Sequence, residues 1–177
     1  MSDLDRPLAN THQVIDLEKR SDALLGSMTD LFEQGQKPHH DAFPDHFGPA
    51  KDRAAIGHYL QGFLKPRNPL RQRNGFAKGW YAGGELAGYL LYRLSKSANI
   101  FYGEPRWTCF VEDIVVSENA RGAGGASALM GALMEEITPL ENCAVSGTVW
   151  NMNAASEALF RKHGFEPLSK AFYKVSP

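Results

Sequence analysis

The chain has 177 residues, of which 43% are hydrophobic and 22% charged, and its formal net charge at pH 7 is −1. These values are typical of one soluble globular domain and argue against a broad basic surface for nucleic acid or an anionic membrane. The sequence contains no apolar run of about 18 residues, so it predicts no membrane span. Residues 1–10 are polar and acidic and lack the sections of a signal peptide, so we expect a cytoplasmic protein.

The first third of the chain predicts one short strand and two helices. Adjacent β-branched residues mark the strand. A capping residue followed by apolar residues at helical spacing marks the first helix, and proline and glycine mark a loop after it. The expected ranges are 12–17 for the strand, 21–34 for the first helix, 36–49 for the loop and 50–64 for the second helix.

Strands dominate from residue 75 onward. Gly83-Gly84 between two strand-like runs predicts a tight hairpin, and a polar connection over residues 95–105 leads to the strongest strand. Gly164 stands where a left-handed residue commonly ends a helix. The expected strands are 76–82, 85–94, 107–116, 144–149 and one or both of 165–168 and 172–175; the expected helices are 126–137 and 153–163.

Strands and helices mix without strict alternation. This order predicts an α/β (α+β mixed sheet) architecture, in which helices flank a mixed sheet. We expect six or seven strands and about four helices in a single domain covering residues 1–177.

Cysteine and histidine give no sign of a metal site. Cys109 and Cys143 fit no Cys-x-x-Cys motif and no metal-ligand spacing, and buried free thiols are favoured over a disulfide. The loop 36–49 holds three histidines. No carboxylate or thiol stands at a recognised spacing from them, so a solvated loop is favoured over a metal site.

The segment most suggestive of chemistry is the turn Arg121-Gly122-Ala123-Gly124-Gly125-Ala126. A strand ends before it and a helix begins after it, so helix amides and flexible glycines meet there. Such groups form a cradle for a pyrophosphate, to which a guanidinium adds charge-assisted hydrogen bonds. Neither the dinucleotide fingerprint nor the Walker pattern is matched. The alternative is a glycine turn that serves close packing alone.

Two motifs carry a family resemblance. The turn 121–126 resembles the Gln/Arg-x-x-Gly-x-Gly/Ala signature with which GNAT N-acetyltransferases bind the pyrophosphate of acetyl-CoA. Residues 153–165, which begin with Asn153 and end in Gly164-Phe165, resemble the second signature of that family. The resemblance implies a GNAT-like fold with an acetyl-CoA-binding core over residues 75–175. Residues 12–70 form the part that varies in the family and shapes the acceptor site.

The resemblance also implies which residues meet acetyl-CoA, the expected co-substrate. Backbone groups of Ile114, Val115 and Val116 would bind the pantetheine arm as they would an added strand. Asn153 would contact the same arm, or cap the last helix, or do both. Phe160 is expected beside the cofactor. The strand 110–116 resembles that of diamine and polyamine acetyltransferases.

Catalysis needs a base, because an amine with a pKa near ~10.4 is almost wholly protonated at pH 7. Glu112 is the expected general base, acting through water, with a structural carboxylate as the alternative. Strand alternation sends Glu112 and Asp113 to opposite faces. Many relatives protonate the departing thiolate with a tyrosine at the position of Phe160. Tyr173 is the candidate substitute, and a packing role is its alternative.

The sequence thus predicts an N-acetyltransferase that transfers acetyl directly from acetyl-CoA to a primary amine of a small molecule. Two alternatives stay open: an acyl-CoA-binding regulatory domain with little catalysis, and a protein or peptide N-acetyltransferase. We expect no nucleic-acid or membrane partner, and a homodimer formed through sheet edges or terminal strands is open.

Overall fold

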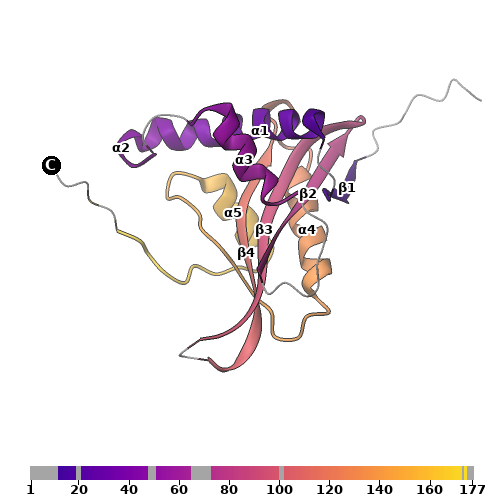
Figure 1. Cartoon of the computed structure of the whole chain (residues 1–177). Coiled ribbons are helices and arrows are strands. Elements are labelled where there is room, and N and C mark those ends of the chain that lie inside the picture. The colour runs from indigo at the N-terminus through magenta and orange to yellow at the C-terminus, as the bar shows by residue number, and fades with distance from the viewer. Residues whose placement is uncertain are drawn as a thin grey trace, which may run out of the picture.

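One five-stranded sheet forms the centre of the fold (Figure 1). The computed structural model describes residues 12–18, 21–47, 51–64, 73–99, 102–172 and 174. The strands follow one another across the sheet in chain order; the first four are antiparallel neighbours, and the last is parallel to the fourth. They are β1 (Gln13–Asp16), β2 (Arg73–Ala82), β3 (Glu85–Asn99), β4 (Tyr102–Val116) and β5 (Ala144–Gly147).

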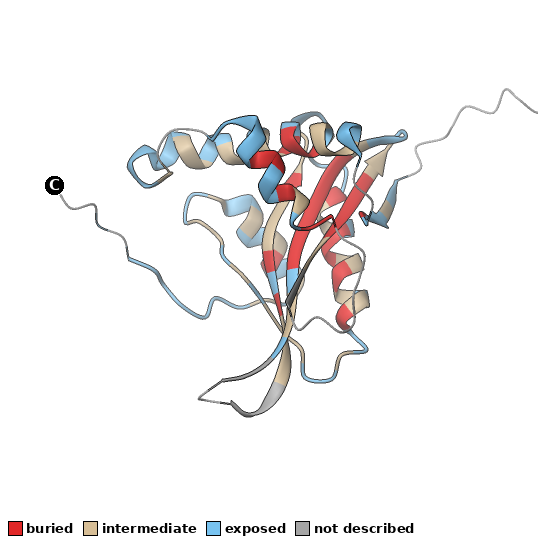
Figure 2. Ribbon diagram, viewed as in Figure 1, coloured by how far each residue is buried: buried red, intermediate tan, exposed pale blue. Residues whose placement is uncertain are grey.

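Helices cover both faces of the sheet. Two hydrophobic clusters lie between helices and strands, one under α1 and α3 and the other under α4 and α5. Buried residues gather along the central strands β2 and β3 (Figure 2). The helices are α1 (Asp22–Ala42), α2 (Pro44–Phe47), α3 (Arg53–Gln61), α4 (Gly125–Ile137) and α5 (Ala154–Lys162), with a short 3-10 helix at Glu118–Ala120.

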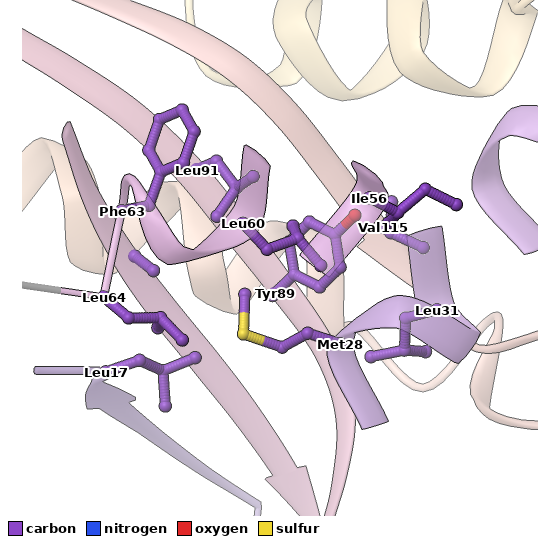
Figure 3. Packing of buried hydrophobic residues seen from close by; sticks show 11 residues of the cluster. Leu17, Met28, Leu31, Ile56, Leu60, Phe63, Leu64, Tyr89, Leu91 and Val115 are labelled. Carbon is purple, nitrogen blue, oxygen red and sulfur yellow. The ribbon is translucent and has the colours of Figure 1, made fainter. Parts of the chain in front are cut away.

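The first cluster fixes α1 and α3 over β3 and β4. Met28 and Leu31 of α1 and Leu60 of α3 pack around Tyr89 and Leu91 of β3 (Figure 3). Each is at most 3% exposed, and burying one such side chain contributes ~1.5–3 kcal/mol. The two helices, which belong to the part expected to shape the acceptor site, are therefore anchored to the strand next to β4.

The second cluster places α4 on the opposite face. Leu129, Leu133 and Ile137 recur every four residues and are all buried against the sheet, which confirms the predicted apolar face of this helix. At its first residue, an added Cβ on Gly125 would collide with the ring of Trp80. The beginning of α4 therefore lies directly on the sheet.

The predicted loop 36–49 is wrong over most of its length. The first helix continues to Ala42, with Pro38 inside it, and α2 follows from Pro44. The proline and glycine content of this segment suggested a loop, but contacts with distant residues favour helix here. The ring of Phe43 packs against Trp150, with ring centroids 5.9 Å apart. The additional helix α2 brings the described α-helices to five, against about four expected.

The predicted polar connection 95–105 is also wrong. The strands β3 and β4 continue as one long hairpin, in which Asn99 pairs with Tyr102, and this arm extends beyond the rest of the sheet (Figure 1). Its polar residues pair across the strands, as shown by the Ser95 and Thr108 hydroxyls at 2.8 Å. Cross-strand pairs of this kind stabilise a sheet without an apolar face.

The expected six or seven strands are not matched, since the described residues form five. Residues 165–168 are not a strand, because no neighbouring strand binds their backbone; Leu168 is 98% exposed. The predicted strand 172–175 lies partly outside the described residues. The predicted end of the last helix is confirmed, as Gly164 has φ of +81°.

Both cysteines are free thiols, as predicted, but only Cys109 is buried, whereas Cys143 is partly exposed. Burial raises the pKa of Cys109 to about 12, so this thiol is an unreactive core side chain. None of the described helices combines the length and the hydropathy that a membrane span requires.

Candidate active site

The glycine-rich turn connects the end of β4 to α4, and two of its glycines are left-handed. Gly122 has φ of +82° and Gly124 φ of +85°, a conformation that glycine adopts without steric cost. A Cβ at either position would meet nothing within 4 Å. These two glycines therefore allow the chain to turn, whereas the neighbouring Gly125 allows α4 to pack closely on Trp80.

The helix α4 begins without a side-chain cap. Its N-cap is Gly124, and no side chain accepts from its first amides. The amides of residues 125–127 have no acceptor inside the helix, and the helix dipole favours an anion at this end. The Arg121 side chain is 55% exposed, and its carboxylate neighbour Glu118 is 3.8 Å away. The turn can therefore hold phosphate oxygens, and it fits the pyrophosphate of acetyl-CoA.

Beside this turn, β4 has an open edge. The strand β5 pairs with β4 only over residues 108–111. Residues 113–116 pair with β3 on their other side, and no strand of the described residues pairs with the outer edge of 112–116. An edge of this kind presents N–H and C=O groups to an extended ligand. Ile114, Val115 and Val116 lie on it, where the sequence predicts pantetheine binding.

A β-bulge in β4 changes the direction of its acidic residues. Leu91 pairs with Asp113 and Tyr92 with Val111, so Glu112 is the extra residue on β4. A bulge breaks the alternation of side chains. The prediction that Glu112 and Asp113 point to opposite faces is therefore wrong.

Both carboxylates lie on the face covered by α1 and α3. The hydroxyl of Tyr89 donates to Asp113 Oδ2 at 2.8 Å, and Arg93 Nε donates to Glu112 Oε1. Tyr89 and Arg93 are four residues apart on β3, so they share a face. On that face the guanidinium of Arg93 lies 4.7 Å from the ring centre of Phe63, just after α3.

Charge and burial affect the titration of this group. Burial raises the pKa of Asp113 to about 6, although hydrogen bonds from Tyr89 and the Ile114 amide oppose the shift. Burial, Asp113 and Glu112 together raise the pKa of Tyr59 to about 12. Tyr59 of α3 is therefore a neutral hydroxyl close to both acids. We call Tyr59, Tyr89, Arg93, Glu112 and Asp113 the carboxylate cluster.

The structure places the remaining predicted residues apart from this cluster. Asn153 is the N-cap of α5, and its Oδ1 accepts from the Ser156 amide at 3.0 Å; the capping role is confirmed, and contact with CoA stays a prediction. Phe160 is 9% exposed and packs against Phe165, with ring centroids 4.9 Å apart. Its ring is therefore part of the core. Tyr173 lies outside the described residues.

Sequence reasoning missed an aromatic cluster that ties α1 and α2 to the segment after β5. The ring of Trp150 lies 4.9 Å from Phe47, 5.0 Å from His46 and 6.1 Å from His39, measured between centroids. Among the described residues, no three His, Cys, Asp or Glu side chains gather as a metal site. The aromatic and histidine side chains at 39, 43, 46 and 47 are a signal that could have pointed to a packed cluster.

Arg93, Tyr59 and Tyr89 were missed as well. Arg93 interrupts a run of apolar residues in the predicted strand 85–94, and a charge beside buried residues is informative. Tyr59 and Tyr89 leave no such signal, because only the packing of α3 on the sheet brings them near β4.

Comparison with known proteins decides the family. The sequence profile of the family described as "Acetyltransferase (GNAT) family" matches residues 31–165. The chain belongs to this acetyltransferase family. Membership confirms the predicted enzyme class and acetyl-CoA as the co-substrate of the fold. The match includes the turn, β4 and both helix layers.

Solved structures share the fold at low sequence identity. A tetramutant of the BH1408 protein from Bacillus halodurans has a TM-score of 0.72 at 14% identity, with 93% of this chain and 99% of that chain covered. Aminoglycoside N-acetyltransferase AAC(6')-Iy in complex with CoA has a TM-score of 0.64 at 17% identity, with 97% and 98% covered. Ribosomal-protein-alanine N-acetyltransferase from Brucella melitensis biovar Abortus 2308 has a TM-score of 0.56 at 15% identity, with 95% and 99% covered.

These likenesses leave the acceptor open. The names of the two acetyltransferases point to acceptors as different as an aminoglycoside and a ribosomal protein. No curated protein matches the chain. The resemblance to diamine and polyamine acetyltransferases stays a prediction.

Proposed function

We propose that this acetyltransferase acts on a primary amine of a small molecule and that Glu112 is its general base. The observation that carries the proposal is the continuity of β4 with the turn. The turn at Gly124 follows β4 in the chain. The open edge of this strand, residues 112–116, ends at the bulge at Glu112. A ligand bound by both the turn and the edge would therefore end beside the two carboxylates.

Backbone groups and the side chain of Arg121 would hold the co-substrate. The amides at the start of α4 and the guanidinium of Arg121 would bind the pyrophosphate, and the backbone of residues 114–116 would bind the pantetheine arm. Bound acetyl-CoA supplies a thioester, which an amine attacks with release of the thiol. Asn153 and Phe160, at the start of α5 and within it, would border the bound co-substrate and not the carboxylate cluster.

Glu112 is the better base of the two acids. Asp113 is held by the Tyr89 hydroxyl and the Ile114 amide, which engage its oxygens. The Glu112 side chain is 23% exposed and is paired with Arg93. It can therefore take a proton from the acceptor ammonium through a water molecule, so that the neutral amine attacks. The departing thiolate needs no strong acid, because a thiol has a pKa near ~8.5.

A small acceptor is supported by the aromatic cluster. Its rings join the end of α1 and α2 to the segment carrying Trp150, so the part of the chain that we expect to shape the acceptor site is tied to the segment after β5. A peptide acceptor would have to avoid this connection, whereas a small amine would not.

Turnover of acetyl-CoA tests the proposal. Release of free thiol is measured over a panel of diamines, polyamines, aminoglycosides, amino acids and peptides for the wild type, Glu112→Gln and Asp113→Asn. We expect turnover of one class of small amine and a loss of about 10²–10³-fold in kcat/KM for Glu112→Gln. The matched control is Glu135→Gln on the exposed side of α4, which should be unchanged.

Each other outcome has a definite meaning. Full activity of Glu112→Gln, with loss in Asp113→Asn, would transfer the role of base to Asp113. Binding of acetyl-CoA without thiol release for any amine would favour a regulatory acyl-CoA-binding domain. Turnover of peptides alone would favour a peptide N-acetyltransferase.

A homodimer and a cytoplasmic location stay predictions from the sequence. The exposure of Leu168 and Phe172, 98% and 95%, on an extended segment supports an association of this segment with another chain, because large apolar side chains gain free energy from burial.

A further inference from the structure

We infer that the acceptor carries an anionic group, a carboxylate or a phosphate, close to the amine that is acetylated, and that Arg93 binds this group. The inference rests on the proposed function, because it specifies the acceptor of the same site. It concerns a residue that the sequence analysis did not single out.

The guanidinium of Arg93 is held on two sides. Its Nε donates to Glu112, and its Cζ lies over the ring of Phe63, 4.7 Å from the ring centroid. No described residue accepts a hydrogen bond from Nη1 or Nη2 of Arg93, and its side chain is 53% exposed. The guanidinium is thus held by two contacts, and its outer N–H donors have no acceptor among the described residues.

This geometry suits an anion with two oxygens. A guanidinium presents N–H donors in a rigid fork that matches a carboxylate or phosphate, and fixing it beforehand reduces the entropy lost on binding. A guanidinium needed only as a counterion for Glu112 could pair through its outer nitrogens. Here the inner Nε makes that bond, so the fork remains available.

The position of Arg93 relates it to the reacting amine. The Arg93–Glu112 ion pair keeps the guanidinium next to the proposed base, beside the bulge where the open edge of β4 begins. An ammonium at Glu112 and an anionic group at Arg93 would therefore lie close together, as the two charges of a small zwitterion do. A polyamine would instead bring a further ammonium against Arg93, and like charges repel. The cluster therefore favours a zwitterionic acceptor over a polycation.

Matched pairs of amines test this inference. An amino acid is compared with its carboxamide, and phosphoethanolamine with ethanolamine, by kcat/KM for thiol release in the wild type, Arg93→Gln and Arg93→Lys. We expect the wild type to prefer the anionic member of at least one pair. Arg93→Gln should raise KM for that member roughly 10- to 100-fold more than for its neutral counterpart, whereas any change in kcat from the lost pairing with Glu112 should be the same for both members. Arg93→Lys should restore part of the loss, since it keeps the charge without the fork.

The controls separate binding from positioning. Arg161→Gln removes an exposed arginine of α5 that pairs with Glu157, and it should change neither member of a pair. An equal loss for anionic and neutral amines in Arg93→Gln, carried by kcat, would overturn the inference and leave Arg93 as a positioning residue for Glu112. A wild-type preference for the neutral member or for polyamines would overturn it as well.

Failure of the proposed function would be recognised separately. If the wild type releases no thiol with any amine, binding of the same anionic compounds to the protein with CoA is followed by calorimetry. Binding that depends on Arg93 would then sustain the anion site without the reaction, and binding unaffected by Arg93→Gln would exclude it.

Discussion

The two sides of β4 are built from different parts of the polypeptide. The side expected to bind acetyl-CoA consists of backbone: the open edge of residues 112–116, two left-handed glycines and an uncapped helix. The other side consists of side chains that α3, β3 and β4 bring together, with Tyr59, Arg93 and Glu112 as examples. A backbone site requires glycine at fixed spacing and so leaves a motif, whereas a side-chain cluster is assembled by packing. We therefore expect a motif to reveal the acetyl-CoA side of the proposed site, and expect its acceptor side to become visible only in the folded structure.

The largest expected effect concerns the donor side. Gly124→Val places a β-branched residue at φ of +85°, a conformation that costs such a residue roughly 1–3 kcal/mol. Because a Cβ there meets nothing within 4 Å, the strain acts on the backbone path alone. We expect the Kd for acetyl-CoA, measured by calorimetry, to rise by about 10- to 100-fold.

The matched control for this change lies on the same helix. A Cβ at Gly131 also meets nothing within 4 Å, and its φ is not left-handed. Gly131→Ala should therefore leave acetyl-CoA binding unchanged and stabilise the fold by about 0.5–1 kcal/mol. Equal Kd values for Gly124→Val and the wild type would show that the turn is not the pyrophosphate cradle.

The next effect separates the two acids of the acceptor side by pH. The folded pKa of Asp113 is about 6, above its ordinary value of 3.8. The folded state therefore binds this proton more readily than the unfolded state, so the associated stability is present below about pH 4 and is lost as the pH rises through 6. Asp113→Asn keeps an acceptor for the Tyr89 hydroxyl and carries no charge. We expect it to be more stable than the wild type by about 3 kcal/mol above pH 7, and by progressively less towards pH 4.

Denaturant unfolding from pH 4 to pH 8 measures this difference. Comparing the two proteins at each pH cancels the titration of other groups, such as His39 and His163, whose pKa values burial lowers. A stability difference that does not vary with pH would contradict the raised pKa. Activity sharpens the comparison, because Asp113→Asn should stay active where Glu112→Gln does not.

The sequence predicted the parts whose physical rules are local. The apolar repeat of Leu129, Leu133 and Ile137 marks the buried face of α4 because helical spacing alone puts them together. Gly164 marks a helix end, and the glycines of 121–126 mark the turn into α4, because each depends on the conformational freedom of glycine; anion binding by this turn stays a prediction. For the same reason the hairpin at Gly83-Gly84 lies between β2 and β3, as predicted.

The sequence could not predict features that depend on partners far along the chain. The bulge at Glu112 arises from the register between β3 and β4, and nothing within residues 107–116 reveals it. The helical path through Pro38 depends on ring contacts with Trp150, more than 100 residues later. The same dependence hid Arg93 and Tyr59, which become significant only once α3 and β3 lie beside β4.

The smallest expected effect tests whether the aromatic cluster belongs to the acceptor side. Trp150→Ala removes the ring shared by Phe43, His46 and Phe47, and each such pair contributes about 0.5–1.5 kcal/mol. We expect faster hydrogen exchange over residues 36–47 and a rise of a few-fold in KM for the acceptor, because α1 and α2 lose their connection to the segment after β5. Trp107→Ala, on the hairpin arm beside Lys96, is the control and should change neither.

The Kd for acetyl-CoA decides what the Trp150 result means. The uncapped helix α4 and the open edge of β4 contain no part of the aromatic cluster, so Trp150→Ala should bind acetyl-CoA as the wild type does. If acetyl-CoA binding falls together with acceptor affinity, the segment after β5 contributes to both sites, and the division between a backbone donor side and a side-chain acceptor side does not hold there. If only the acceptor KM changes, the aromatic cluster borders the acceptor site. The size of any larger amines that Trp150→Ala accepts and the wild type does not would then measure the space that the rings occupy.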